Sequence, residues 1–175
     1  MAGVPLTDAK WTTFMNQLTF DEMKNLISAT GFNTGAIDVI GKIKQTDADG
    51  AGQLSKGTFW VGAVLLASTW NVELAEMQGI MVGNESLFQN VQGWYGPSMN
   101  THRSPFSGRN FEYYSQDGVQ AAKIAAAVVK GAQSKGVVTY IKHFALNDQE
   151  QNRQINGGVI TWCSEQAMRE NYLKP

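Results

Sequence analysis

The sequence predicts an α/β fold in which parallel strands alternate with helices. Along the chain, the apolar pattern gives a helix, a strand, a long polar loop, a second helix, a second strand, another polar loop and a last helix. This alternation is typical of parallel βα units. The polar segments follow strands, which is where α/β folds place their active sites. We therefore expect the functional residues in those loops.

Length and composition limit the class of protein. The chain has 175 residues, 43% hydrophobic and 17% charged, which fits one globular domain and excludes a disordered chain. The 14 basic and 15 acidic residues give a net charge of -1, which argues against nucleic acid as a partner. The longest apolar run, residues 59–67, is shorter than the roughly 20 residues that cross a bilayer, so no membrane partner is expected. Residues 1–10 show no signal-peptide pattern, which predicts a cytoplasmic protein only if this is the native N-terminus.

The counts of cysteine and histidine limit the chemistry further. A single cysteine, Cys163, excludes an internal disulfide and a cysteine-rich zinc site. The two histidines, His102 and His143, leave few ligands for a transition metal. Glycine-rich dinucleotide and phosphate motifs are also absent from the sequence. We therefore expect neither a metal nor a cofactor. Because Cys163 lies in an apolar setting beside Trp162, we expect it to be buried and unreactive.

Residues 1–45 are predicted to form a helical lead-in. Its pattern indicates two short helices. Thr19 and Glu22 form a capping box at the start of the second helix, and Gly31 is a natural stop.

The next predicted helix begins at an asparagine cap. Asn71 precedes an apolar pattern that continues toward Asn84, near which we expect the helix to end. The apolar residues of this pattern are Leu74, Met77, Met81 and Val82.

The second half of the chain carries the clearest pattern. Short strands are predicted at residues 91–95, 137–141 and 159–162. A helix from Gly118 ends at Gly136, and a last helix is capped by Ser164 and continues through Tyr172. The apolar stripe of the first of these helices is Ala121, Ile124, Ala125, Val128, Val129 and Ala132.

A glycine-rich loop at residues 46–52 carries the first candidate site. It contains Asp47 and Asp49, but an EF-hand register would place Gln45 and Lys56 at the first and last ligand positions, where neither fits. Two interpretations remain open. The loop is either an Asx-type turn or holds a carboxylate that accepts hydrogen bonds from a polar ligand.

The long polar loop at residues 97–117 carries the second candidate site. Loops beyond about 12–15 residues without regular structure are usually functional or disordered. Arg103 and Arg109 offer planar forks of donors that suit carboxylates or vicinal hydroxyls. Alternatively, Glu112 forms an ion pair with one of the arginines and so holds the loop in place. The spacing favours neither interpretation.

Lys142 and His143 form the third candidate site, at the end of the strand at residues 137–141. A lysine there would serve as a Schiff-base residue, a phosphate contact or a donor to sugar hydroxyls. Alternatively, the pair is a solvated strand terminus. The polar residues 147–156 that follow favour a pocket.

Taken together, three segments resemble glycoside hydrolase family 3, and most closely its β-glucosidase branch. The hexosaminidase branch follows its Lys-His pair with Pro-Gly-His-Gly, which this chain lacks. The resemblance runs from about Leu6 to Pro175. Its motifs are Ala67-Ser68-Thr69-Trp70-Asn71, residues 100–115, and Lys142-His143-Phe144-Ala145-Leu146-Asn147-Asp148-Gln149-Glu150 with Asn152-Arg153.

The resemblance implies a fold and an activity. The fold is a partial (β/α)8 TIM-type barrel, roughly its first half, because a whole barrel takes about 250 residues. Residues 1–175 would then be the incomplete N-terminal portion of the barrel domain. The implied activity is hydrolysis of terminal non-reducing β-D-glucosyl residues by a retaining mechanism, with a β-glucoside or gluco-oligosaccharide as substrate.

The resemblance also implies roles for particular residues. In the family, an aspartate of an Asp-Gly loop, the arginine of Gly-Arg-Asn-x-Glu and the Lys-His pair hold glucose. The residues that match are Asp49, Arg109, Lys142 and His143. Arg103, Glu112 and Arg153 also fall in motif positions, and we expect them to frame the pocket.

Departures from the family pattern limit what this chain does alone. The family's nucleophilic aspartate lies in a Thr/Ser-Asp-Trp context that is absent here, and its acid/base glutamate comes from a second domain. We therefore expect no catalytic residue in this chain, which would be inactive without the remaining half of the barrel and the second domain, on the same or a separate chain. The arginine that often follows the Asp-Gly loop is also missing, since residues 52–55 read Gly-Gln-Leu-Ser.

Two other interpretations predict different behaviour. A non-catalytic carbohydrate-binding half barrel would bind glucose but show no activity even when supplemented. A structural or assembly fragment would expose apolar surface and associate tightly with a partner chain.

Overall fold

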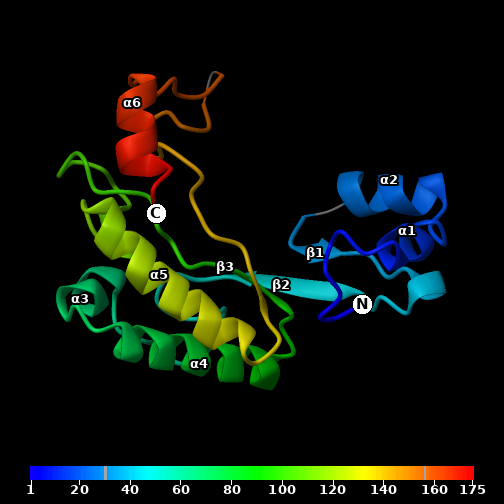
Figure 1. Ribbon diagram of the computed structural model, residues 1–175. Helices are drawn as coiled ribbons and strands as arrows, with labels where there is room; N and C mark the ends of the chain where they lie inside the picture. The colour runs from blue at the N-terminus through cyan, green and yellow to red at the C-terminus, as the bar shows by residue number, and fades with distance from the viewer. Residues whose placement is uncertain (30, 156) are drawn as a thin grey trace. The chain divides into compact units, whose positions relative to one another are not determined.

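The computed structural model describes residues 1–29, 31–155 and 157–175 (Figure 1). The chain separates into two compact units, Met1–Asp47 and Ala48–Pro175. Among the described residues, no helix has the length and apolar character required to cross a membrane.

The first unit contains the two helices that the sequence predicts. They are α1 (Lys10–Met15) and α2 (Phe20–Ser28). The capping box is confirmed, since Glu22 N donates to Thr19 Oγ1 at 3.2 Å and Thr19 N donates to Glu22 Oε2 at 2.8 Å. A short strand, β1 (Asn33–Thr34), pairs antiparallel with the start of β2 (Gln45–Asp49).

Helix α4 (Val72–Gln89) begins where the sequence predicts and ends later. Asn71 Oδ1 accepts hydrogen bonds from Glu73 N at 2.9 Å and Leu74 N at 3.0 Å, which confirms the N-cap. The predicted end near Asn84 is wrong. The helix continues to Gln89, and Asn90 adopts a φ of 55° and serves as the C-cap.

The buried face of α4 also differs from the prediction. Of the predicted apolar residues, Val82 is buried, but Leu74 and Met77 are 43% and 63% exposed, and most of the buried positions are small residues on another face. The reason is the close approach of α5 (Gly118–Gln133), which brings backbone against backbone. A Cβ atom on Gly79 would lie only 2.1 Å from the carbonyl oxygen of Val128. The buried residues of α4 are Ala75, Gln78, Gly79, Val82, Gly83 and Ser86.

Helix α5 follows its predicted stripe. Ala121, Ile124, Ala125, Val128 and Ala132 are all buried, whereas Val129 is only partly buried. The helix ends earlier than predicted, at Gln133 with Ser134 as its C-cap. Gly136 lies in the turn that follows, where its N donates to the carbonyl oxygen of Gln133 at 2.9 Å and its φ of 88° is a conformation that glycine adopts readily. Together with the short helix α3 (Ala63–Ser68), α4 and α5 supply most of the core of the second unit.

The predicted parallel pairing is confirmed. The strand order is β1-β2-β3-β4, and β3 (Gly93–Tyr95) pairs in parallel with β4 (Val138–Thr139). Helix α5 lies between these two strands in the chain, as in a βαβ unit. An isolated parallel bridge joins Ser98 to Lys142 beyond the ends of both strands. The residues after β3 and β4 therefore begin side by side.

The C-terminal segment contains one correct prediction and two wrong ones. Ser164 caps α6 (Glu165–Ala167), and a π-turn at Met168–Tyr172 extends it as predicted. The strand predicted at residues 159–162 does not form. A strand needs a neighbour for its backbone hydrogen bonds, and none of the described residues pairs with this segment, in which Ile160 is 95% exposed. Cys163 is partly exposed rather than buried.

Candidate active site

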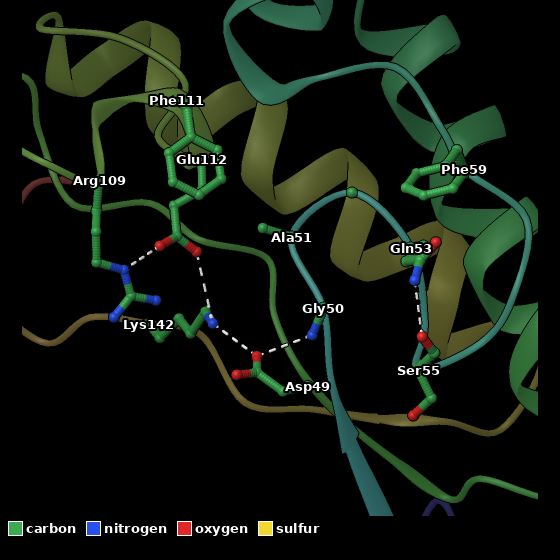
Figure 2. A pocket seen from close by; sticks show the side chains of 11 residues that line it. Asp49, Gly50, Ala51, Gln53, Ser55, Phe59, Arg109, Phe111, Glu112 and Lys142 are labelled. Atoms are coloured by element: carbon green, nitrogen blue, oxygen red, sulfur yellow. Dashed lines mark hydrogen bonds and ion pairs between the residues drawn. The ribbon is translucent and has the colours of Figure 1, made fainter.

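A pocket of about 470 Å³ lies where the loops after three strands meet (Figure 2). One wall comes from the end of β2 and the loop after it, a second from the long loop after β3, and a third from Lys142 after β4. Polar loops that follow strands thus converge, as the sequence analysis expects. The lining residues are Asp49, Gly50, Ala51, Gly52, Gln53, Ser55, Phe59, Arg109, Phe111, Glu112 and Lys142.

Lys142 joins two carboxylates across the pocket. Its Nζ lies 2.7 Å from Asp49 Oδ1 and 3.5 Å from Glu112 Oε2. Figure 2 shows the resulting chain of charges, which runs from Arg109 through Glu112 and Lys142 to Asp49. The structure therefore brings together three of the four residues expected to hold glucose.

Glu112 is the buried anchor of this chain of charges. Arg109 Nε donates to Glu112 Oε1, and the hydroxyl of Ser98 donates to Glu112 Oε2 at 2.6 Å. Burial acts to raise the pKa of Glu112, but these two donors and the charge of Lys142 outweigh it and lower the pKa. Glu112 is therefore ionised at neutral pH. The alternative in which it pairs with an arginine is correct, and the pair lies inside the pocket rather than away from it.

Asp49 is the accessible carboxylate of the pocket. Gly50 N donates to Asp49 Oδ1 at 2.8 Å, and the side chain is 53% exposed. Its other oxygen, Oδ2, accepts no hydrogen bond from the described residues and so remains available to a ligand. Asp47 is buried and does not line the pocket, and burial raises the pKa of its carboxyl group.

His143 does not line this pocket but belongs to an adjacent polar network. Its Nδ1 lies 2.7 Å from the hydroxyl oxygen of Tyr113. Asn147 Nδ2 donates to the same hydroxyl at 2.8 Å and to Glu150 Oε1 at 2.9 Å. Glu150 Oε1 lies 3.9 Å from a guanidinium nitrogen of Arg109, so the network reaches the wall of the pocket.

Burial keeps both rings of this network uncharged. Burial and the nearby charge of Arg109 lower the pKa of His143 to about 4. Burial raises the pKa of Tyr113 to about 12. At neutral pH, His143 is therefore an uncharged imidazole and Tyr113 an uncharged phenol.

The remaining two sequence candidates lie farther from the pocket. Arg153 Nε donates to Glu150 Oε2 at 2.9 Å, so Arg153 contacts the network rather than the pocket wall. The guanidinium of Arg103 lies 5.6 Å from the ring centre of Tyr172, beside a separate hollow of about 270 Å³.

Several pocket residues carry no signal in the sequence. Phe59 and Phe111 are exposed aromatic residues that contribute apolar surface to the pocket (Figure 2). Gln53 and Ser55 place neutral groups in the segment where family members often carry an arginine. Ser98 lies beside Lys142 only because β3 and β4 pair in parallel, so strand register is the signal that identifies it.

The low pKa of His143 predicts how stability depends on pH. The free energy of unfolding is expected to fall as pH drops from about 6.5 to about 4, because unfolded His143 binds a proton in that window while the folded residue does not. His143→Gln should flatten the profile within the window. Urea unfolding at a series of pH values measures this. Equal slopes for the two proteins would contradict the prediction.

Comparison with known proteins supports the sequence-based assignment. Residues 15–175 match the family described as Glycosyl hydrolase family 3 N terminal domain. The chain is 37% identical to a β-glucosidase of Rhizobium radiobacter over 92% of its own length, and 47% identical to Beta-glucosidase A of Butyrivibrio fibrisolvens over 64%. These alignments cover only 20% and 13% of the two relatives, so the chain spans a fifth or less of their length.

Solved structures share the fold. β-Glucosidase 3B of Thermotoga neapolitana in complex with glucose superposes with a TM-score of 0.82 at 36% identity, over 94% of this chain and 27% of that one. The family 3 β-glucosidase of Bifidobacterium adolescentis gives a TM-score of 0.83 at 35% identity, over 91% of this chain and 24% of that one. The predicted α/β class, with part of a TIM-type barrel, is therefore confirmed. The chain belongs to glycosyl hydrolase family 3, and residues 15–175 belong to its N-terminal domain.

Proposed function

We propose that this chain supplies the glucose-binding part of a β-glucosidase that acts on terminal non-reducing β-D-glucosyl residues with retention of configuration. The pocket that unites Asp49, Arg109 and Lys142 carries the proposal. Its two carboxylates and two cations cancel in charge, which suits a neutral polyol better than a phosphate or carboxylate ligand. The relatives and solved structures are β-glucosidases, which is consistent with this choice of sugar.

The pocket offers donors and acceptors together, as a sugar requires. A sugar hydroxyl both donates and accepts hydrogen bonds, and Asp49 Oδ2 supplies a charged acceptor for it. Lys142 has three N–H donors and Arg109 has five, more than their carboxylate partners use. We assign glucose binding to these three residues and to His143 in the adjacent network. Hydrogen bonds to the sugar that strengthen in the transition state contribute several kcal/mol to such hydrolysis.

We further propose that the two catalytic carboxyl groups come from outside residues 1–175. A retaining mechanism requires a nucleophile and an acid/base about 5–5.5 Å apart. Glu112 is unsuited to either role because it is buried and already bonded to Arg109 and Ser98. The relatives are several times longer than this chain and so have room for the remaining half of the barrel and a second domain.

Asp49→Asn is expected to weaken glucose binding by about tenfold or more, because a neutral amide replaces a charged acceptor. Titration of the chain with glucose, monitored by calorimetry or NMR, measures the affinity of each variant. Asp21→Asn on α2 makes the same chemical change at an exposed residue that does not line the pocket, and should leave affinity unchanged. Equal affinities for the two variants would remove Asp49 from the site.

Hydrolysis of a chromogenic β-glucoside tests the source of the catalytic groups. The chain is assayed alone and together with the remaining barrel half and second domain. Activity only in the completed enzyme is expected. Activity of the chain alone would overturn the proposal and direct attention to Glu150, a carboxylate of the network, and to Asp148. Glucose binding with no activity in either assay would instead favour a non-catalytic sugar-binding module.

A further inference from the structure

We infer that the negative charge of Glu150, acting through Asn147 and Tyr113, fixes His143 in the tautomer that carries its proton on Nε2. Asn147 and Tyr113 are then positioning residues for His143. The hydrogen-bond directions in this network follow from donor and acceptor chemistry alone. The role of the fixed proton in sugar binding rests on the proposed function.

The first step is the charge of Glu150. Its Oε2 accepts a hydrogen bond from Arg153 Nε at 2.9 Å, and its Oε1 lies 3.9 Å from Arg109. Burial opposes ionisation, but Asn147 and the two arginines outweigh it and lower the pKa of Glu150. Glu150 is therefore a carboxylate that only accepts hydrogen bonds.

The second step is the orientation of the Asn147 amide. Its terminal nitrogen lies 2.9 Å from Glu150 Oε1 and 2.8 Å from the hydroxyl of Tyr113. An amide turned the other way would place its oxygen against a carboxylate oxygen that has no proton to share. The NH₂ group must therefore face Glu150, and its two hydrogens are directed to Glu150 and to Tyr113.

The third step is the single proton of the Tyr113 hydroxyl. Because the oxygen accepts a hydrogen bond from Asn147, the proton remains for the other neighbour, His143 Nδ1, at 2.7 Å. Nδ1 then accepts through its lone pair. A neutral imidazole carries one ring proton, so the proton of His143 lies on Nε2.

The result is a donor of fixed direction. No described residue forms a hydrogen bond with His143 Nε2. The charges around the ring are those of Arg109, Lys142 and Arg153, which disfavour protonation, and of Glu112, which favours it. Because burial and the excess of cations both lower the pKa of His143, the ring stays neutral and the N–H persists through the neutral pH range. In the proposed function, this N–H donates to a hydroxyl oxygen of the sugar.

NMR of the chain labelled with ¹⁵N-histidine tests the inference directly, because the two ring nitrogens differ strongly in chemical shift when one tautomer dominates. His102 supplies an internal reference. Its Nε2 lies 2.9 Å from the carbonyl oxygen of Asn110 and 2.8 Å from that of Tyr113, both pure acceptors, so it also carries a proton. Both histidines of the wild-type chain are expected to show Nε2–H. A dominant Nδ1–H form of His143 would overturn the inference without any variant.

Single substitutions then test whether Glu150 acts on His143 through Tyr113. Tyr113→Phe should reduce the shift difference between the two nitrogens of His143, since neither tautomer keeps a partner at Nδ1, and should leave His102 unchanged. Tyr114→Phe removes the same hydroxyl from the next residue and should alter neither histidine. Glu150→Gln should also reduce the difference, because a neutral amide no longer dictates the orientation of Asn147. An unchanged His143 in both Tyr113→Phe and Glu150→Gln would overturn the inference.

Glucose titration of the labelled chain separates this inference from the proposed function. Movement of the Nε2 signal of His143 with glucose supports both. An Nε2–H tautomer in a chain that does not bind glucose would support the inference and overturn the proposed glucose site. Glucose binding by a chain whose His143 carries Nδ1–H would overturn the inference and support the proposed glucose site.

Discussion

Lys142→Ala is expected to lower kcat/KM for β-glucoside hydrolysis by about tenfold or more in the enzyme that contains this domain. The substitution removes a donor to the sugar and also leaves Asp49 and the buried Glu112 without a shared counter-charge. Hydrogen bonds that involve a charged group contribute about 1.5–3 kcal/mol, and about 1.4 kcal/mol corresponds to a factor of ten. Steady-state kinetics with a chromogenic β-glucoside measures the loss.

Lys130→Ala is the matched control for this result. Lys130 Nζ lies 2.8 Å from Glu76 Oε2, about as close as Lys142 lies to Asp49, but its side chain is 72% exposed whereas that of Lys142 is 13% exposed. An exposed ion pair contributes little to stability, so Lys130→Ala should leave kcat/KM unchanged and unfold at nearly the wild-type urea concentration. Wild-type kinetics in Lys142→Ala would exclude Lys142 from the site.

Gly131→Ala is expected to destabilise the fold by about 1–3 kcal/mol or more, the range typical of overpacking. The added Cβ would lie 2.2 Å from the carbonyl oxygen of Glu76 on α4, a backbone atom that cannot move aside as a side-chain tip does. The effect opposes helix propensity, which favours alanine over glycine by about 1 kcal/mol. Urea unfolding with an unchanged m-value measures it.

Gly118→Ala makes the same substitution in the first turn of the same helix. There the nearest atom to the added Cβ is 3.4 Å away, an ordinary contact, so stability should be equal to or slightly above that of the wild type. If the two variants unfold at the same urea concentration, backbone contact is not what holds α4 against α5.

Local chemistry explains which elements could be predicted from the sequence. The capping box of Thr19 and Glu22 and the cap at Asn71 depend only on residues within one helical turn, and both are present. The buried face of α4 depends instead on a second helix, α5, that begins 29 positions after α4 ends. Hydrophobicity alone predicts that Leu74 and Met77 are buried. The face that is buried instead carries glycine, because the backbones of the two helices pack closely there.

The same division applies to the site. Asp49, Arg109 and Lys142 could be proposed from motif positions, since Arg109 and Lys142 follow predicted strands and Asp49 lies in a glycine-rich polar segment, although the strand β2 that ends at Asp49 is not predicted. Their arrangement around one buried carboxylate could not be predicted. In the sequence, Glu112 is simply an acidic residue of a polar loop, and only the fold shows that it is buried. The link from Tyr113 to His143 joins residues thirty positions apart and has no sequence signature.

The contact between α4 and α5 also costs little side-chain entropy and selects one register. Glycine and alanine lose almost no side-chain freedom on burial, so these helices dock without immobilising many rotamers. A shift of one residue would move Gly79 and Gly131 out of the contact and force larger side chains against the opposing backbone. One alignment of the two helices is therefore selected. Because β3 follows α4 and β4 follows α5, that alignment also sets Ser98 beside Lys142 and so determines where the walls of the pocket meet.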